Sequence, residues 1–223
     1  MVYPEFMPGT LHRLRQDYRA DQLLSYLQKK AAEIPILDLR PGLISAKPSG
    51  LLYHRYDTHW NDRGGLVAYQ AIVKAVREMA SPIATTKPLT LEDFTTSAEV
   101  SSGDRTTLLG LKDPGRATMP GLVPRNGYGY KTVVPEWPNP YGEDALRVTE
   151  HRDVSLPRLV MFRDSFAARL MPYLSEHFSR ASYYWQNEFD FDALEQEHPD
   201  IVIQEFVARH FFTWVPYPGI IPP

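Results

Sequence analysis

LPRLVMFRDSFAARLMPYLSEHF, from Leu156 to Phe178, is the stretch that decides the fold of this chain. Its apolar run Leu159–Phe162 is short and continuous, which is typical of a strand buried in a parallel sheet. After Arg163-Asp164-Ser165, apolar residues recur at positions 166, 170, 173, 174 and 178, the spacing of one helix face. The stretch therefore predicts a strand, a turn and a helix, with Ser165 in the turn.

Ser165 would lie above the carboxyl end of its strand, where α/β sheets place reacting groups. The N-terminus of the next helix favours negative charge that develops there, so Ser165 is a candidate nucleophile. An ordinary helix N-cap, formed by Asp164 or Ser165, explains the same residues, and this stretch alone leaves both interpretations open. We expect Asp164 to cap or brace the turn rather than to act as the acid of a triad.

A second polar stretch, Tyr53–Asn61 (YHRYDTHWN), places Asp57 two residues before His59. A carboxylate at this spacing can hold the imidazole in one tautomer and stabilise its protonated form, and a serine hydroxyl needs such a base to become a nucleophile. A polar turn capped by Asn61 or Asp62 is the alternative, and the two interpretations are compatible. Metal ligation by Asp57 and His59 is a further alternative, although the sequence shows no other cluster of His, Asp or Glu that would complete a site.

The composition narrows the class of protein. The chain has 223 residues, which suits one α/β domain with a sizeable core. Its 24 Lys and Arg against 27 Asp and Glu give a net charge of −3, which argues against a general nucleic-acid binder. The absence of cysteine excludes disulfides and thiolate metal sites. No apolar stretch approaches the ~20 residues that span a bilayer, and no signal peptide is visible at the N-terminus.

Further elements follow from the spacing of apolar residues along the chain. The predicted helices are residues 10–32, 64–80 and 191–197, and the predicted strands are residues 34–39, 181–185 and 201–206. Together with the strand at 159–162, the alternation of strands and helices towards the C-terminus predicts a parallel sheet with helices on both faces.

Residues 84–155 lose this periodicity and accumulate Thr, Ser, Pro and Gly. So long a connection is expected to be an irregular insertion, either a functional elaboration or a locally disordered segment. Its aromatic residues, Trp137 and Tyr141 among them, could line a saccharide cleft or pack against the domain, as loop aromatics commonly do. Trp60 also has two possible interpretations: it is either a packing residue that shields the site or a platform on which a sugar ring stacks.

Separated motifs of this chain resemble one known family. They are Asp57-Thr58-His59-Trp60-Asn61 followed by Gly64-Gly65, Arg163-Asp164-Ser165-Phe166, His198–Arg209, and Tyr3–Pro8 at the start. In content and order they are similar to the SGNH-hydrolase-like domain of alginate O-acetyltransferases. The resemblance implies a triad of Asp57, His59 and Ser165 in an SGNH-hydrolase-like (flavodoxin-like) α/β fold with a parallel sheet flanked by helices. Ordinary SGNH enzymes carry the serine first and the histidine last, so the motif order here is rearranged; geometry rather than order defines a triad.

The resemblance also carries expectations about the extent and location of the protein. The family places a core strand just before the Tyr3–Pro8 motif, so residues 1–223 are expected to form a single domain that lacks its N-terminal strand. The location that the resemblance implies is the bacterial periplasm. That location agrees with the lack of a visible signal peptide only if the chain is a fragment or a mature form.

The chemistry that the resemblance implies is acyl transfer without a cofactor. Ser165 would take an acetyl group from a donor, such as a membrane acetyl-transfer protein, and pass it to hydroxyls of an exopolysaccharide such as alginate. Candidate oxyanion donors are the backbone N–H groups of Ser165 and Phe166, together with the side chains of Arg163 and Asn61. Two alternatives remain: transfer of the acetyl group to water, as in a carbohydrate esterase, and a non-catalytic role in polysaccharide binding or assembly.

Overall fold

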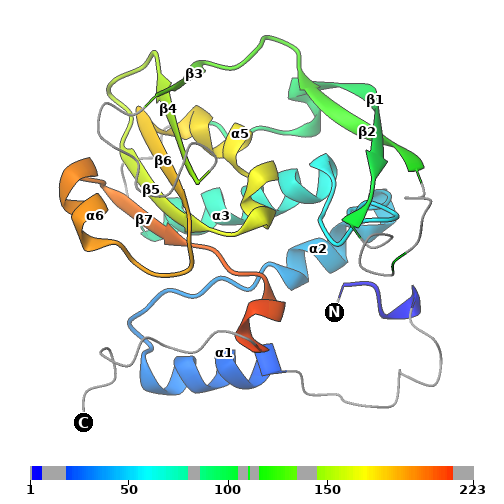
Figure 1. Cartoon of the computed structure of the whole chain (residues 1–223), viewed down its shortest axis with the longest axis horizontal. Coiled ribbons are helices and arrows are strands. Elements are labelled where there is room, and N and C mark those ends of the chain that lie inside the picture. The colour runs from blue at the N-terminus through cyan, green and yellow to red at the C-terminus, as the bar shows by residue number, and fades with distance from the viewer. Residues whose placement is uncertain are drawn as a thin grey trace. The chain divides into compact units, whose positions relative to one another are not determined.

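The computed structural model describes residues 2–6, 19–79, 86–104, 110, 116–134 and 145–212 (Figure 1). Contacts separate the chain into two compact units, residues 39–205 and a smaller unit of residues 1–38 with 206–223. The two terminal segments form a unit of their own because their residues contact mainly one another; that residues 1–223 form one domain stays a prediction. The larger unit contains all three residues of the expected triad.

In its described residues, the smaller unit contains short helices only. Its elements are η1 (Pro4–Phe6), α1 (Arg19–Lys30) and η7 (Ala208–Phe212), and α1 contacts η7. α1 agrees with the second half of the helix predicted over residues 10–32; residues 7–18 lie outside the described part. The strand predicted over residues 34–39 is wrong, because these residues pair with no strand in the described chain. Pro35 has no N–H to donate, and the apolar side chains around it, Ile34, Ile36 and Leu37, are exposed.

The larger unit is built around a five-stranded sheet with the strand order β3-β4-β6-β5-β7. The strands are β3 (Tyr130–Val133), β4 (Leu146–His151), β5 (Arg158–Arg163), β6 (Arg180–Trp185) and β7 (Ile201–Gln204). β5 lies between β6 and β7 and is parallel to both. These three strands are the ones that the sequence predicts, and the α/β class is confirmed.

The outer strands β4 and β3 make the sheet mixed, which corrects the expectation of a wholly parallel sheet. β4 pairs antiparallel with β6, and β3 pairs antiparallel with β4. Both come from residues 84–155, which were expected to be irregular. In β4 only Leu146, Val148 and Thr149 are buried, and β3 buries no residue. Strands that bury so little have a weak apolar pattern, so the sequence does not reveal them.

Residues 84–155 also form a separate two-stranded ribbon. After η4 (Leu91–Asp93), β1 (Phe94–Ser102) pairs antiparallel with β2 (Arg116–Pro124) along the whole length of both strands. Pro120 within β2 lies opposite Ala98 and has no N–H for the ladder, which is why β2 does not read as a strand. The insertion is therefore mainly β-structure in its described part. Trp137 and Tyr141 lie outside the described residues.

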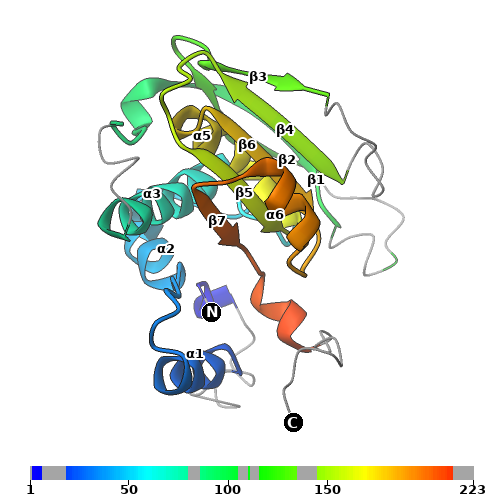
Figure 2. The same ribbon diagram turned by 90° about the vertical axis from the view of Figure 1, so that its left-hand side faces the viewer.

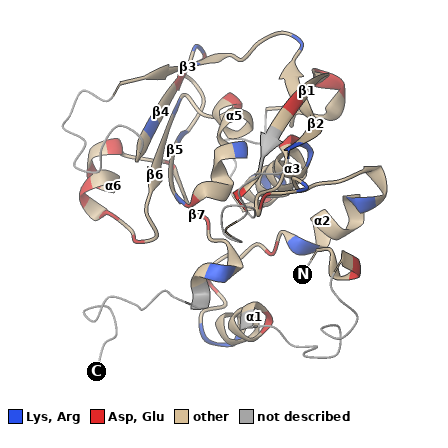
Figure 3. Ribbon diagram, turned by 45° about the vertical axis from the view of Figure 1, so that its right-hand side comes forward, with Lys and Arg blue, Asp and Glu red and all other residues tan. Residues whose placement is uncertain are grey.

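Helices cover both faces of the sheet, as the sequence predicts. Figure 1 and Figure 2 show α3 (Asp62–Met79) and α5 (Met171–Leu174) on one side and α6 (Phe191–Glu197) on the other. Strands β4, β5 and β6 pack with α6 in a hydrophobic cluster, whose buried residues are Leu146, Val148, Val160, Phe162, Tyr184 and Ala193. Acidic residues occur along α6 (Figure 3), and Asp190 caps its N-terminus by accepting the N–H of Ala193 at 3.0 Å. Among the described residues, no helix has both the length and the apolarity needed to cross a membrane.

The helix predicted after Ser165 is broken into three short pieces. They are η5 (Ser165–Arg169), α5 and η6 (Ser175–His177). Pro172 lies in the first turn of α5, where its missing N–H is tolerated, but its ring prevents one helix from continuing through it. The residues that predicted the helix are all buried nonetheless: Phe166, Leu170, Tyr173, Leu174 and Phe178. The spacing thus predicted the buried face but not the continuity of the helix.

Candidate active site

The histidine lies in a short closed loop that follows α2 (Arg40–Ala46) and η2 (Lys47–Ser49) and precedes α3. Tyr53 and Trp60 form an isolated antiparallel bridge, and the N–H of His54 donates to the carbonyl oxygen of His59 at 3.1 Å. These contacts close the loop from Tyr53 to Trp60, which we call the base loop. Inside it, Asp57 Oδ1 accepts the backbone N–H of His59 at 3.0 Å. The two-residue spacing lets one carboxylate fix the backbone of the loop and also face the ring of His59.

The serine follows β5 in a turn of residues 163–166, which we call the nucleophile turn. Asp164 has an extended backbone and caps η5, because its Oδ1 accepts the backbone N–H of Phe166 at 2.8 Å. Ser165 is the first residue of η5 and follows the carboxyl end of a central parallel strand. Asp164 is therefore the N-cap of the turn, and Ser165 is presented beyond it.

Asp57, His59 and Ser165 lie together, although 106 residues separate His59 from Ser165. His59 Nδ1 lies 2.7 Å from Asp57 Oδ1, and His59 Nε2 lies 2.6 Å from Ser165 Oγ. Burial raises the pKa of Asp57, but hydrogen bonds from the backbone and ring of His59 outweigh burial and leave this pKa below its ordinary value. An ionised carboxylate only accepts, so Nδ1 carries the proton and Nε2 accepts the hydroxyl proton of Ser165. In this arrangement a histidine can act as general base towards a serine.

Trp60 connects the base loop to the nucleophile turn. Its indole N–H donates to the carbonyl oxygen of Phe166 at 2.9 Å, and its ring packs edge-on against the ring of Phe166. Phe166 also contacts the ring of His59, with the ring centroids 4.8 Å apart. Only 4% of Trp60 is exposed, so a sugar ring cannot stack on it, and this corrects the substrate-binding interpretation. Trp60 instead links the two halves of the site through this hydrogen bond and ring contact.

Asn61 is the N-cap of α3, which corrects its candidacy as an oxyanion donor. Its Oδ1 accepts the N–H of Gly64 at 3.1 Å, its amide donates to the carbonyl oxygen of Leu51 at 2.8 Å, and the residue is fully buried. The glycines that follow permit close packing of α3. A Cβ at Gly64 would lie 2.1 Å from the carbonyl oxygen of Leu52, and one at Gly65 would lie 2.9 Å from the Cβ of Arg169. The start of α3 therefore presses against both halves of the site.

The backbone N–H of Ser165 is the oxyanion donor that the geometry leaves available. It makes no hydrogen bond with any residue that the structure describes. The N–H of Phe166 already donates to Asp164 Oδ1, which corrects that candidate. Arg163 packs against Trp185, its guanidinium 4.3 Å from the centre of that ring, and donates to the carbonyl oxygen of Asp164 at 3.3 Å. Burial lowers the pKa of Arg163 to about 10, so it stays cationic at neutral pH and places a positive charge beside the turn.

Glu205 is a buried acid beside the nucleophile turn that sequence reasoning missed as a site residue. Its Oε2 accepts the backbone N–H of Asp164 at 3.1 Å, and its own N–H donates to the carbonyl oxygen of Phe162 at 2.9 Å. Burial, and then the charge of Asp164, raise the pKa of Glu205 to about 8. The available signal was its position directly after β7, at the same edge of the sheet as Ser165.

A second missed acid, Asp104, contacts the base loop from just beyond β1. It accepts two hydrogen bonds from Thr58, and its Oδ2 lies 3.9 Å from His59 Nδ1. The possible metal-ligand atoms of Asp57, His59 and Asp104 lie within 4.8 Å of one another. Asp104 is therefore a third possible metal ligand beside Asp57 and His59, which the sequence did not reveal. Both ring nitrogens of His59 already face Asp57 and Ser165, so a metal ion would have to displace one of these contacts.

Comparison with known proteins identifies the fold. No curated protein sequence gives a significant match to this chain. Among solved structures, a DHHW family protein from Eubacterium siraeum has a TM-score of 0.66 at 14% identity, over 89% of this chain and 72% of its own. Bacillus cereus PatB1 has a TM-score of 0.58 at 18% identity, over 89% of this chain and 75% of its own. The O-acetyltransferase domain of Pseudomonas putida AlgJ has a TM-score of 0.54 at 21% identity, over 100% of this chain and 76% of its own.

The family rests on a sequence match rather than on these structures. The family model described as "SGNH hydrolase-like domain, acetyltransferase AlgX" matches residues 1–134, more than half of the chain. The matched part contains Asp57 and His59 and ends before Ser165, so the pairing of base and serine comes from the geometry. The SGNH-hydrolase-like fold that the motifs predict is confirmed by this match. The chain belongs to the family of SGNH-hydrolase-like acetyltransferase domains typified by AlgX.

Proposed function

We propose that this protein is an O-acetyltransferase that moves an acetyl group through Ser165 to hydroxyl groups of an exopolysaccharide such as alginate. The observation that carries the proposal is the position of His59, whose ring nitrogens lie 2.7 Å from Asp57 Oδ1 and 2.6 Å from Ser165 Oγ. Membership of an acetyltransferase family supports acetyl transfer as the reaction. The choice of polysaccharide rests on the resemblance of the motifs.

The first half of the reaction forms acetyl-Ser165. His59 Nε2 takes the hydroxyl proton while Ser165 Oγ attacks the carbonyl carbon of an acetyl ester. Asp57 stabilises the imidazolium that forms, and the N–H of Ser165 at the start of η5 donates to the oxyanion. When the tetrahedral intermediate collapses, the leaving alcohol takes the proton from His59 and the acetyl group stays on Ser165.

The second half passes the acetyl group to the acceptor. A sugar hydroxyl gives its proton to His59 while its oxygen attacks the carbonyl carbon of acetyl-Ser165. Ser165 Oγ then leaves and recovers the proton from His59, which restores the resting site. Water in place of the sugar would release acetate by the same steps. Transfer and hydrolysis therefore differ only in which hydroxyl occupies the acceptor position.

The partners and location of this reaction also belong to the proposal. The acetyl donor would be an acetyl ester, presented by a membrane acetyl-transfer protein, and the acceptor would be the polysaccharide chain. We place the reaction in the periplasm because the motifs resemble those of periplasmic enzymes. The steps above use only side chains and backbone groups of this chain, and none of them requires a cofactor.

Covalent labelling of Ser165 tests the proposal directly. The protein is incubated with p-nitrophenyl acetate, and peptide mass spectrometry then locates the added acetyl group. We expect acetylation at Ser165, and we expect Ser165→Ala and His59→Ala to reduce nitrophenol release by at least about a thousandfold. Unlabelled Ser165 with unchanged turnover in Ser165→Ala would contradict the mechanism.

The fate of the acetyl group separates the enzyme classes. Oligomannuronate is added to the acetylated protein, and acetylated sugar and free acetate are measured together. Acetylated sugar as the main product supports the transferase, whereas acetate alone would indicate an esterase. Sugar binding without any acetyl-Ser165 would indicate a polysaccharide-binding protein.

A further inference from the structure

We propose that Asp104 is a positioning residue of this site, a second carboxylate that fixes the base loop and stabilises the protonated ring of His59. This proposal rests on the proposed roles of His59 and Ser165. It assigns a function to the β1–β2 ribbon, which lies in the sequence between the two motifs of the site.

The first observation is the pair of hydrogen bonds from Thr58. The backbone N–H of Thr58 donates to Asp104 Oδ1 at 2.8 Å, and its hydroxyl donates to Asp104 Oδ2 at 2.5 Å. Thr58 is the residue between Asp57 and His59. One carboxylate therefore fixes the middle of the Asp-x-His motif by two bonds, which restricts rotation of the backbone on both sides.

The second observation concerns the backbone before Asp104. A Cβ at Gly103 would lie 1.5 Å from the carbonyl oxygen of Tyr56 and 2.6 Å from the backbone nitrogen of Asp57. These are backbone atoms that cannot move aside, so only glycine permits the contact. The end of β1 thus packs directly on the base loop, independently of the bonds that Asp104 makes.

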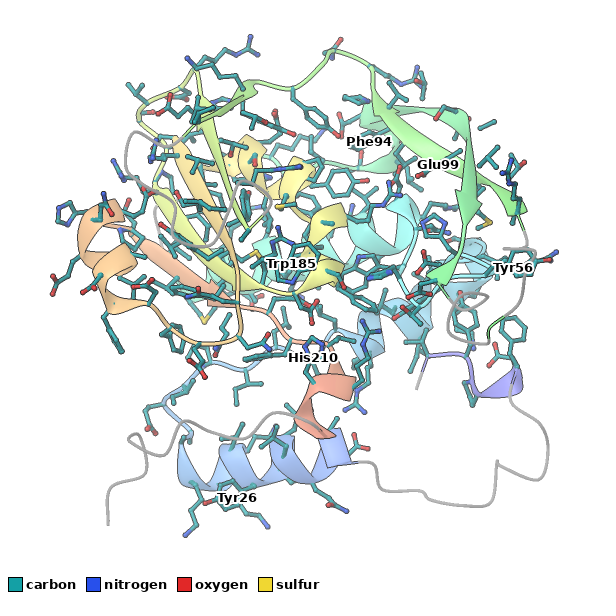
Figure 4. All side chains as sticks on the ribbon, viewed as in Figure 1. Tyr26, Tyr56, Phe94, Glu99, Trp185 and His210 are labelled. Atoms are coloured by element: carbon teal, nitrogen blue, oxygen red, sulfur yellow. The ribbon has the colours of Figure 1, made fainter. Side chains whose placement is uncertain are left out.

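The third observation is that β1 also holds the other half of the site. Glu99 Oε1 on β1 pairs with Nη2 of Arg169 at 2.6 Å, and Nη1 of Arg169 pairs with Asp62 Oδ1 at 2.7 Å. Arg169 ends η5, the helix that begins with Ser165. Figure 4 labels Glu99 of β1 and Tyr56 of the base loop. β1 and the two residues directly after it therefore contact both the segment that carries the base and the segment that carries the serine.

The negative charge of Asp104 lies near the ring of His59, which becomes positively charged during the reaction. During attack His59 becomes an imidazolium, and Asp104 Oδ2 lies 3.9 Å from its Nδ1, next to the direct partner Asp57. Two carboxylates at this range favour the protonated ring more than one does. The charged groups that act on His54 of the base loop are Arg169, Glu99, Asp57 and Asp62, and the loop also contains Arg55, which is exposed. Asp62 and Glu99 pair with Arg169, whereas Asp57 and Asp104 lie 2.7 Å and 3.9 Å from His59 Nδ1.

The test replaces Asp104 by asparagine and measures the rate of Ser165 acetylation against pH. We expect the rate to fall roughly ten- to hundredfold, as for a small misplacement of a catalytic group. We also expect the acidic inflection of the rate profile to move to lower pH, because His59 loses a negative neighbour. Asp104→Glu, which keeps the charge, is expected to restore the inflection in part.

Asp93→Asn is a matched control from the other end of β1. Asp93 Oδ2 accepts the backbone N–H and the hydroxyl of Thr90, at 2.7 Å and 3.1 Å, so it makes the same pair of bonds away from the site. We expect this variant to lower thermal stability slightly and to leave rate and pH profile unchanged. Thr58→Val removes the hydroxyl bond but keeps the charge of Asp104, so it should slow acetylation without moving the inflection. If Asp104→Asn does not fold, Thr58→Val tests the positioning role in its place.

Histidine NMR makes the proposal testable without turnover. In labelled protein, the protonation midpoint of the His59 ring should move to lower pH in Asp104→Asn and stay in place in Asp93→Asn. An unchanged midpoint and an unchanged rate in Asp104→Asn would refute the role of Asp104. If wild-type Ser165 were never acetylated while the midpoint shift was present, the proposed function would fail and the positioning role would stand.

A chelator distinguishes positioning from metal binding. The same carboxylates could ligate a divalent cation together with His59, so the wild-type protein is assayed after treatment with EDTA. We expect no change in the rate of acetylation. Loss of activity that Mg²⁺ or Zn²⁺ restores, together with loss of cation binding in Asp104→Asn, would make Asp104 a metal ligand and overturn the proposal.

Discussion

At the scale of single residues, the site contains two aspartates with different hydrogen-bond partners. One contacts the base loop and the other contacts the nucleophile turn. Asp57 faces the ring of His59, whereas Asp164 accepts the N–H of Phe166 within the turn that holds Ser165. The first aspartate can influence a proton that moves during the reaction. The second shapes the turn and, through it, the position of Ser165, and its charge acts on Glu205 rather than on the ring of His59.

Replacing these two aspartates should therefore give different phenotypes. Asp57→Asn removes the charge that orients and stabilises the ring, so we expect turnover to fall by about 10⁴-fold with little loss of stability. Asp164→Ala removes an N-cap, so we expect a loss of about 1 kcal/mol in unfolding free energy and a smaller effect on turnover. Steady-state kinetics and thermal unfolding of both variants provide the measurements. A fully active Asp57→Asn beside an inactive but folded Asp164→Ala would reverse the assignment.

Glu205 leads to a prediction about stability at alkaline pH. Its pKa is raised to about 8 by burial and by Asp164, so the folded state holds a proton that the unfolded state releases near pH 4.5. The contribution of Glu205 to the unfolding free energy is complete below pH 4.5, and it is lost as the pH rises from there through about 8. Glu205→Gln removes the titration, so its unfolding free energy should fall less than that of the wild type between pH 5 and 8. Denaturant unfolding across this range checks the difference, and parallel curves would contradict it.

At the scale of elements, buried strands are the part of the fold that the sequence predicts well. β5 and β6 are interior strands that are buried along most of their length, and the apolar run of β5 is continuous. β7 lies at the edge and has no buried residue, but its apolar run Ile201–Ile203 still predicts it. β1 and β2 pair mainly with each other, and their Ser, Thr and Pro content hides them. The ion pair of Glu99 with Arg169 joins residues 70 positions apart, and no local pattern predicts a contact of that kind.

The packing of η6 against α3 leads to a prediction about stability in acid. His177 in η6 is buried between Tyr69 of α3 and Thr86, whose hydroxyl lies 2.7 Å from Nδ1, and its other ring nitrogen contacts the hydroxyl of Tyr69. Burial lowers the pKa of His177 to about 4, so the ring is neutral in the folded protein. Its stabilising contribution is present above the ordinary value of 6.5 and is lost as pH falls towards 4.

We therefore expect the unfolding free energy to fall by up to about 1.4 kcal/mol for each pH unit below 6.5 through this group. Glu205 acts in the opposite sense over part of this range, so the measurement must compare variants rather than use one curve. In His177→Gln the difference from the wild type should shrink as pH falls from 6.5 to 4. A difference that stays constant with pH would show that His177 does not titrate on unfolding.

At the scale of the whole molecule, the site is assembled from three distant segments: the base loop, the nucleophile turn and the end of β1. The sequence selects Asp57, His59 and Ser165 as candidates because each lies in a short motif with a recognisable chemistry, and the fold brings the three side chains together. Asp104 lies in no such motif, and Glu205 lies in the His198–Arg209 motif, which has no recognisable chemistry of its own; the contacts of both acids depend on how the segments meet in the fold. Trp60 and Asn61 were misassigned for the same reason, since only the fold shows that their polar groups are already bonded.

The last prediction concerns how acetyl-Ser165 divides between transfer to a sugar and hydrolysis by water. This division depends on how the acceptor is bound, and residues 84–155, outside both motifs, can contribute to that binding. The insertion between the two motifs carries Trp137 and Tyr141, and such rings suit the apolar faces of pyranoses. If they hold a sugar chain beside acetyl-Ser165, the intact protein should acetylate an oligosaccharide faster than it releases acetate. The double variant Trp137→Ala/Tyr141→Ala should then lose more transfer than hydrolysis of a small ester. Tyr26→Ala, which removes a 58% exposed aromatic from α1, serves as the control and should leave the partition unchanged. An unchanged partition in the double variant would remove these two residues from the acceptor site.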